Sequence, residues 1–286
     1  MSKRWEVLDS GQVSDIIQSK ALLEELVEFH WWYYSELAFQ RNRVREQLKT
    51  SLRDKALPFE FSKWQRIVKY KYSLEPLSTK GSLVDPGGRF NVGEIDPLRY
   101  PVFPALYIAS DKSTGLAEVL GREDPIGGLT PQELALTRQD SVSAVSVSGK
   151  LESVIDIRDR KNLGSFVSLI RKFTLSKPLI AKARKLNVHV GLIQTPKMLG
   201  EALEQRDWRN WPMLFDVPST CQIFGGLVKN AGIEGILYNS CLTQKACVVI
   251  FPQTFLNSSA YVELDDPAPT EHVPRRIDSS NFRNFV

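Results

Sequence analysis

A glycine-rich turn, a short apolar strand and an apolar helix follow one another between residues 87 and 120, and this succession most constrains the fold. Residues 87–93 read Gly-Gly-Arg-Phe-Asn-Val-Gly, in which the glycines let the backbone adopt positive φ and approach a ligand closely. Residues 105–109 read as a buried strand, and residues 116–120 read as a helix with an N-cap at 110–111. The succession places Arg89 on a turn, Tyr107 on a strand and Glu118 on a helix.

Each polar or aromatic residue of interest also has an ordinary structural interpretation. Arg89 is suited to a phosphate or a carboxylate, but an arginine also braces loops. Tyr107 by itself reads as a core aromatic, and Ser240, between two predicted strands, as a turn serine. Glu118 reads as a solvated charge or as a carboxylate facing a cleft, since its neighbours are apolar and Gly115 is expected to leave open space on its face.

The N-terminal half predicts a helical segment followed by strands and a loop. Residues 12–57 keep helical spacing of apolar residues up to the proline at 58, with an aromatic cluster at 31–39 that is typical of core or partner packing. Residues 64–72 alternate apolar and polar side chains like a half-buried strand. Residues 78–104 are rich in Gly and Pro and read as a long, functional loop.

The C-terminal half predicts further short strands mixed with helices. Strands are expected at 142–147, 154–157, 232–238 and 246–251, a basic helix pair at 166–185 interrupted at Pro178, and a helix after 218–220 that runs to 228. This irregular mixture favours an α+β fold over a doubly wound sheet. A Rossmann fold is not expected, because no G-x-G-x-x-G follows a predicted strand.

The expected division of the chain has three parts. These are a helical N-terminal extension (1–58), a main domain (59–262) and an extended, proline-rich tail (263–286).

The formal net charge is +4, but the charge is unevenly distributed. Residues 158–209 hold twelve Lys or Arg residues against four acids. This segment reads either as solvated helix faces or as a surface that attracts an anionic partner, such as a dinucleotide, an acidic protein or nucleic acid.

Cysteine and histidine usage argues against a metal site. The three cysteines have no metal-knuckle spacing and suit a reducing compartment, and the three histidines are scattered. No apolar run has the length of a signal or a membrane span, so a cytoplasmic protein without a membrane contact is expected.

The order of these motifs resembles the RES family of bacterial toxins, named after an arginine, a glutamate and a serine. The resemblance covers about residues 62 to 254, and the apolar residues 248–251 match the family's closing strand. It rests on five positions: Arg66 in the first predicted strand, Arg89, Tyr107, Glu118 and Ser240. The resemblance implies a core similar to mono-ADP-ribosyltransferases, with mixed, mainly antiparallel strands, surrounding helices and an N-terminal helical extension.

The resemblance also implies an activity that destroys NAD by cleaving the bond between nicotinamide and ribose. It implies that NAD is bound as the substrate, and the cysteine and histidine usage predicts that no metal takes part. The catalytic residues are then expected to be Glu118, Arg89, Tyr107 and Ser240. The residues expected to bind NAD are Arg66, Arg89, Tyr107, Asn91 and Ser240, with the two guanidinium groups on the diphosphate.

The leading prediction is the NAD-consuming toxin of a toxin–antitoxin pair, as a glycohydrolase that uses water or a phosphorylase that uses phosphate. An alternative keeps the site but transfers ADP-ribose to a protein. A second alternative is a non-catalytic module in which the N-terminal helices and residues 158–209 bind a protein or nucleic acid. The resemblance implies a cognate antitoxin, with nucleic acid reached only through that antitoxin. Homo-oligomerisation stays open.

Overall fold

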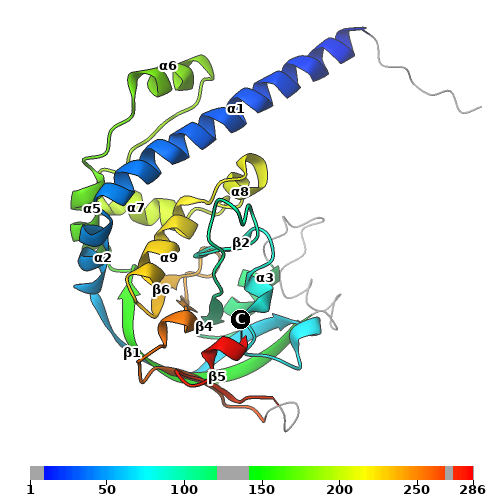
Figure 1. Cartoon of the computed structure of the whole chain (residues 1–286). Helices are drawn as coiled ribbons and strands as arrows, with labels where there is room; N and C mark the ends of the chain where they lie inside the picture. The colour runs from blue at the N-terminus through cyan, green and yellow to red at the C-terminus, as the bar shows by residue number, and fades with distance from the viewer. Residues whose placement is uncertain (1–9, 121–141, 268–272, 286) are drawn as a thin grey trace, which may run out of the picture.

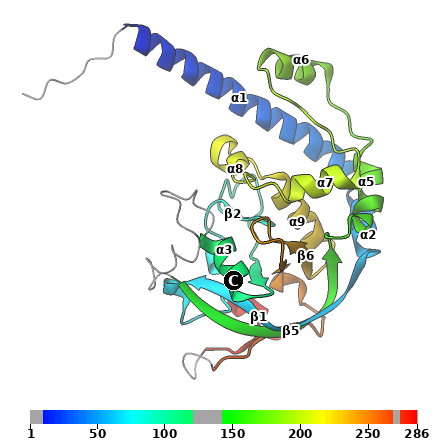
Figure 2. The same ribbon diagram turned by 180° about the vertical axis from the view of Figure 1, so that it is seen from behind.

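The chain folds into a strongly coiled β-sheet with a layer of helices and one long helix that extends from the body (Figures 1 and 2). The computed structural model describes residues 10–120, 142–267 and 273–285. The helices are α1 (Ser10–Arg43), α2 (Arg45–Arg53), α3 (Lys112–Leu120), α5 (Gly164–Ile170), α6 (Lys177–Lys185), α7 (Pro196–Leu203), α8 (Asn210–Phe215) and α9 (Thr220–Asn230). The 3₁₀ turns are η1 (Tyr70–Tyr72), η2 (Lys80–Ser82), η4 (Arg160–Leu163), η5 (Pro252–Thr254) and η6 (Phe282–Phe285).

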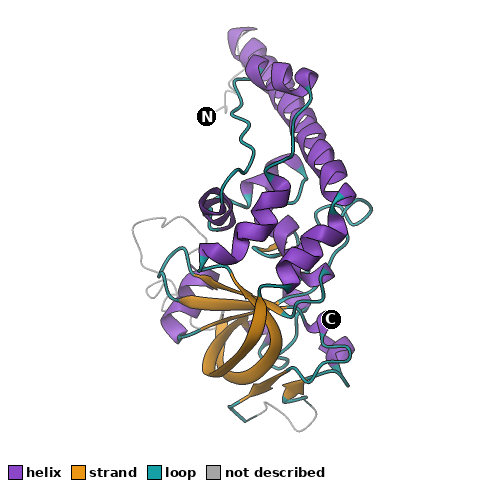
Figure 3. Ribbon diagram, turned by 90° about the vertical axis from the view of Figure 1, so that its left-hand side faces the viewer, coloured by secondary structure: helices purple, strands orange, loops and turns teal. Residues whose placement is uncertain are grey.

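The main sheet closes on itself. Its strands are β1 (Ala56–Lys69), β4 (Leu106–Ala109), β7 (Ala246–Ile250), β6 (Gly235–Asn239), β5 (Val142–Asp156), β8 (Tyr261–Leu264) and β9 (Arg276–Ile277), in that spatial order. Because β1 pairs with both β4 and β5, the first five strands form a ring, which Figure 3 shows as a coiled sheet. Among the described strands, β5 and β6 form the parallel pair and the other pairs are antiparallel. The expected α+β class with mainly antiparallel strands is confirmed.

Two apolar cores lie on opposite faces of this sheet. The larger one packs α2, α5, α7 and α9 against the sheet, with Phe90, Phe224 and Phe251 among its buried side chains. The smaller one lies between β5, β8 and the C-terminal segment, where Phe255 and Phe285 are buried. The helices therefore bury one face of the ring, and the end of the described chain covers part of the other.

The expected helix over 12–57 is divided and ends earlier. It separates into α1 and α2 at Val44, and β1 already begins at Ala56, so Pro58 lies inside a strand. The pairing of β1 with β5 shifts register between Leu57 and Phe59. A proline cannot donate a ladder hydrogen bond, and such an irregularity accommodates it.

The expected strand over 64–72 is also corrected, because β1 ends at Lys69 and η1 follows.

Two further expectations about element boundaries are corrected. The separate strands expected at 142–147 and 154–157 are one strand, β5, which passes through Gly149. A methyl group at this glycine would lie 2.6 Å from the ring of Phe61, so the glycine allows close packing across the ring rather than a turn. Pro178 does not interrupt a helix pair but stands in the first turn of α6, after the N-cap Ser176.

The long loop expected at 78–104 contains η2 and a small hairpin of β2 (Gly87–Gly88) and β3 (Asn91–Val92). The tail expected to be extended forms β9 and η6, and Thr79 donates from its backbone N–H to Phe285 O at 2.8 Å. Residues 268–272 of that expected tail lie outside the described residues. Of the described helices, none has the length and apolar character needed to cross a membrane.

The long helix α1 lies beside α6, as both Figures 1 and 2 show. Lys182 pairs with Glu28 at 2.5 Å, and Lys185 pairs with Glu25 at 3.0 Å. Part of the positive charge of residues 158–209 is therefore balanced by acids of the N-terminal helix.

Candidate functional site

Glu118 and Ser240 are joined directly, although 122 residues separate them. Glu118 lies near the end of α3, and Ser240 begins the turn after β6. Ser240 Oγ donates to Glu118 Oε1 at 2.6 Å and accepts from the backbone N–H groups of Leu242 and Thr243 at 3.2 and 3.3 Å. Ser240 is fully buried. Because a hydroxyl has a single proton to donate, Ser240 orients the carboxylate.

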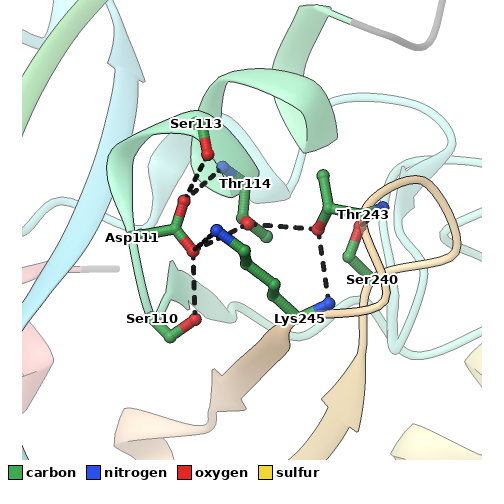
Figure 4. Close-up of polar contacts among 7 residues, drawn as sticks. All are labelled: Ser110, Asp111, Ser113, Thr114, Ser240, Thr243 and Lys245. Carbon is green, nitrogen blue, oxygen red and sulfur yellow. Dashed lines mark hydrogen bonds and ion pairs between the residues drawn. The ribbon is translucent and has the colours of Figure 1, made fainter.

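A polar cluster, here called the α3 clip, joins the start of α3 to the same turn (Figure 4). It consists of Asp111, Thr114, Thr243 and Lys245. Asp111 accepts from the backbone N–H and the hydroxyl of Thr114, both at 3.0 Å, and pairs with Lys245 at 3.3 Å. The hydroxyls of Thr114 and Thr243 lie 3.1 Å apart. The clip thus fixes α3 against the turn that carries Ser240.

Asp111 provides a test of the clip. Burial acts to raise the pKa of Asp111, but hydrogen bonds from Ser113 and Thr114 and the ammonium group of Lys245 outweigh it and hold the pKa well below its usual range. Replacing Asp111 by alanine should lower the free energy of unfolding by about 1 kcal/mol at pH 7, the usual cost of losing an N-cap. Urea denaturation of both proteins measures this difference.

The pH dependence of that difference follows from the lowered pKa. Because the pKa of Asp111 is lower in the folded than in the unfolded chain, its stabilisation is fully present above the ordinary carboxyl range, about pH 4, and is lost as the pH falls below it. The stability difference should therefore shrink when urea denaturation is repeated at acidic pH. Ser113→Ala removes one hydrogen bond and keeps the cap, so its effect should be smaller. A difference that is independent of pH would contradict this account of the clip.

Asn91 holds the glycine-rich turn in shape. Its Oδ1 accepts from Gly88 N at 2.9 Å and from the Tyr107 hydroxyl at 2.8 Å. Its Nδ2 donates to the carbonyl oxygens of Ser82 and Phe103 at 2.7 and 3.0 Å. Asn91 is fully buried, and each polar atom of its amide has partners within the protein. The geometry therefore favours a role for Asn91 in positioning the turn.

Tyr107 connects strand β4 to the same turn. Its hydroxyl donates to Asn91 and accepts from the backbone N–H of Phe90 at 3.0 Å. A methyl group at Gly88 would lie 2.6 Å from the Tyr107 ring, and Gly87 has a φ of 91°. The expectation of special backbone geometry in this turn is confirmed at Gly87, and Gly88 is needed for the contact with the ring.

Helix α9 supports the turn from the other side. Gln222, fully buried, donates from Nε2 to the carbonyl oxygens of Pro86 and Asn91 at 2.7 and 3.1 Å. Three residues later, a methyl group at Gly225 would lie 2.6 Å from the carbonyl carbon of Phe90 and closer still to its oxygen. The helix and the turn backbone therefore touch at Gly225, and no larger residue fits there.

The turn places Arg89 among buried polar groups. Its Nη1 donates to the carbonyl oxygens of Leu203 and Gln205 at 3.2 and 2.8 Å. Burial acts to lower the pKa of Arg89, but interactions with its neighbours, which include Cys241 and Glu118, outweigh it and raise the pKa. Burial also raises the pKa of the Cys241 thiol, so this thiol is uncharged at neutral pH. Cys221 and Tyr238 are the other neighbours that raise the pKa of Arg89, and the contribution of Glu118 is the smallest of the four.

Arg66 braces the loop after β1. Its Nε, Nη2 and Nη1 donate to the carbonyl oxygens of Pro76 (2.6 Å), Ser78 (2.6 Å) and Tyr107 (3.2 Å). Burial lowers the pKa of Arg66 to about 10, so the guanidinium is still charged at neutral pH. Three of its five N–H groups are used in this bracing, and its side chain lines a hollow beside Tyr107.

Two hollows meet at Tyr107. The smaller, of about 40 Å³, is lined by Glu118, Tyr107 and Tyr238. The larger, of about 180 Å³, is lined by Arg66, Gly88 and Tyr107. The expected open space beside Gly115 is corrected, since a methyl group there would lie 2.8 Å from the side chain of Ile67. This glycine lets α3 approach β1 closely, and it lines the smaller hollow together with Glu118.

Several residues of the site were not predicted from the sequence. Gln222 is a polar residue in a helix, and Asp111, Thr243 and Lys245 read as cap and turn residues. Gly225 lies inside the helix expected after 218–220. Its lack of a side chain was the one signal that another backbone approaches there.

Among the described residues, no group of three or more His, Cys, Asp or Glu side chains is arranged to hold a metal ion. The described cysteines at 221, 241 and 247 are buried and free.

Comparison with known proteins gives a family and a structural likeness. A family model for the RES domain matches residues 63–274. One solved structure that matches is the crystal structure of the M. tuberculosis MbcT-MbcA toxin-antitoxin complex. The matched chain is 14% identical, with 84% of this chain and 97% of that chain covered and a TM-score of 0.40. No curated protein matches the chain.

Proposed function

Because the chain belongs to the RES domain family, we propose that it is a toxin that consumes NAD by cleaving the bond between nicotinamide and ribose. The observation that carries the proposal is the Glu118 carboxylate, which Ser240 holds at 2.6 Å and which lines a hollow together with Tyr107 and Tyr238. The proposal includes a cognate antitoxin protein as the partner of this toxin. The main domain of the proposal spans residues 59–262, with the N-terminal helices as an extension and residues 263–286 as a tail.

The proposed chemistry uses the carboxylate as an electrostatic stabiliser. When the bond between C1′ and nicotinamide breaks, the bonding electrons leave with nicotinamide, which becomes neutral. Positive charge develops on C1′ and on the ring oxygen of the ribose, as in other glycosyl transfers. Glu118 interacts more favourably with that developing charge than with the charge distribution of bound NAD. This difference lowers the activation free energy of bond cleavage. Ser240 keeps one carboxylate oxygen fixed, so that little reorganisation is needed.

The remaining site residues receive roles that agree with their contacts. Arg89 is the proposed partner of the diphosphate, because among the described residues its hydrogen bonds, to the carbonyl oxygens of Leu203 and Gln205, use only Nη1. Arg66, which lines the larger hollow, is the second proposed partner of the diphosphate. Tyr107 lines both hollows while its hydroxyl holds the turn, which suits contact with the nicotinamide. Asn91 positions the turn that carries Arg89.

The proposal is tested by incubating the purified protein with NAD, with and without inorganic phosphate, and analysing the products. A glycohydrolase releases nicotinamide and ADP-ribose in both conditions, whereas a phosphorylase releases a phosphorylated ADP-ribose and depends on phosphate. With NAD labelled in the adenylate half and a cell extract added, label on a macromolecule would favour transfer to a protein. The absence of nicotinamide release in every condition would overturn the NAD proposal and favour a binding module.

Arg89 allows a sharper test of substrate contact. The Arg89→Ala protein should show a Michaelis constant for NAD that is roughly 10- to 100-fold higher, the scale of losing a charge-assisted hydrogen bond. Its maximal rate should change less, because the reacting bond lies at Glu118. Steady-state kinetics of nicotinamide release measure both constants. Arg171→Ala, at an exposed arginine, serves as the control, and an unchanged Michaelis constant in Arg89→Ala would remove Arg89 from the diphosphate.

A further inference from the structure

A third cavity lies away from the candidate site, between α1, α9 and the segment 188–193. Its volume is about 260 Å³. Its walls are mainly aromatic and aliphatic, with Tyr34 and Leu37 of α1, Phe224 and Leu227 of α9, and Ile170 of α5 among them. An apolar protein cavity of about 150 Å³ can hold benzene, so this one has room for a longer apolar group.

The wall formed by α1 carries two polar side chains, His30 and Arg41. They are eleven residues apart, which corresponds to about 16 Å along a helix, and they lie on the same face. Tyr34 and Leu37 lie between them on that face. The cavity therefore offers an apolar path with a polar group toward each end.

Arg41 has no acidic partner among the described residues. Its guanidinium lies 5.5 Å from the ring centre of Tyr34, and burial lowers its pKa, with Tyr34 and Tyr33 as the neighbours that act against the decrease. Acids of the same helix are engaged elsewhere, since Glu28 pairs with Lys182. A partly buried guanidinium without a carboxylate favours an anion, because the anion restores the interactions lost with water.

His30 has an unsatisfied polar atom. Its side chain is 7% exposed, and Nδ1 has no hydrogen-bond partner among the described residues. Its ring packs against Phe215 and Trp211 at centroid distances of 3.8 and 4.8 Å. Burial lowers the pKa of His30 to about 4, so the ring is neutral at pH 7 and can form a hydrogen bond with a neutral group. Buried polar groups in proteins rarely lack partners.

From these contacts we propose that the cavity binds a linear amphipathic carboxylate, with its carboxylate on Arg41 and its apolar body between Tyr34, Leu37 and helix α9. The polar end at His30 accommodates a hydroxyl group at the far end of such a molecule. This site is separate from the NAD site, and its occupation does not depend on the proposed NAD chemistry.

The test uses isothermal titration of the full chain with decanoate, with 1-decanol and with 10-hydroxydecanoate. Decanoate should bind one site at least about tenfold more tightly than 1-decanol, which lacks the carboxylate. The terminal hydroxyl of 10-hydroxydecanoate should give binding at least as tight as that of decanoate. Equal binding of decanoate and 1-decanol, or no binding at about 1 mM ligand, would overturn the proposal.

The chain offers a matched pair of arginines for this titration. Arg41→Gln should abolish the preference for decanoate over 1-decanol. Arg43→Gln changes an arginine of the same helix that lies over Phe39, outside the cavity, and should leave the preference unchanged. Equal effects of the two substitutions would show a general charge effect and would overturn the site. Circular dichroism checks that each variant is folded.

A cavity-filling variant provides an independent check. Leu37→Trp places a larger side chain in the cavity and should weaken decanoate and 1-decanol equally, by about tenfold or more. If Arg41→Gln does not fold, the wild-type comparison of decanoate with 1-decanol and this variant decide the proposal. Undiminished decanoate binding by folded Leu37→Trp would place the ligand elsewhere and would contradict it.

Discussion

The Glu118→Gln protein should lose NAD turnover by about two orders of magnitude or more, the scale of removing one preorganised electrostatic stabiliser. Glutamine keeps the shape of the side chain, and its carbonyl oxygen can still accept the hydrogen bond from Ser240. The negative charge that stabilises the transition state is removed. The rate of nicotinamide release by the two purified proteins, at saturating NAD, measures the effect.

Two controls make this result interpretable. The melting temperature of Glu118→Gln should stay close to that of the wild type, which separates lost chemistry from lost folding. Glu201→Gln removes a carboxylate from an exposed i,i+4 pair with Lys197 and should leave turnover unchanged. A Glu118→Gln protein that consumes NAD at the wild-type rate would rule out the proposed role of this carboxylate.

The second large effect is expected at Gly225. A methyl group at this position would collide with the backbone of Phe90, which cannot move away as a flexible side chain can. The Gly225→Ala protein should therefore be destabilised by about 1–3 kcal/mol, the cost of overpacking, or more if the turn cannot shift. Displacement of the turn also moves Arg89, so NAD turnover should fall. Urea denaturation measures the first effect and nicotinamide release the second.

The adjacent glycine is a matched control in the same helix. At Gly226 the nearest atoms to an added methyl group belong to the ring of Phe103, at 3.7 Å, which is an ordinary contact. Gly226→Ala should be neutral or stabilising by up to about 1 kcal/mol, because alanine favours a helix interior. If both substitutions had the same effect on stability, the contact between α9 and the turn would not be the cause. The stability comparison holds whether or not the protein consumes NAD.

The parts of the fold that follow local patterns were predictable from the sequence. The apolar run at 105–109 forms β4, the helix after Asp111 forms α3, and the capped segment at 220 forms α9. Glu118 and Tyr107 could be recognised as candidates, because each places a polar group inside one of these apolar runs. Their assembly into one site was expected from the resemblance, and their proposed chemical roles remain to be tested.

Other features could not be predicted because they depend on contacts between distant segments. The single strand β5 passes through Gly149, whose neighbours Phe61 and Tyr261 come from two other strands. The role of Gln222 depends on the carbonyl oxygens of a turn more than 130 residues away. Pro58 reads as a helix terminator, and only the register shift against β5 explains why it is tolerated in a strand.

The closed ring also has a consequence for the timing of synthesis. Strand β7 pairs with β4 on one side and β6 on the other, so neither of those strands has its full set of partners until residues 246–250 have left the ribosome. The ring thus depends on pairings between distant parts of the chain, which form slowly. At ordinary translation rates, synthesis of the chain up to β7 takes on the order of tens of seconds. The proposed activity is therefore not expected before residues 246–250 have emerged.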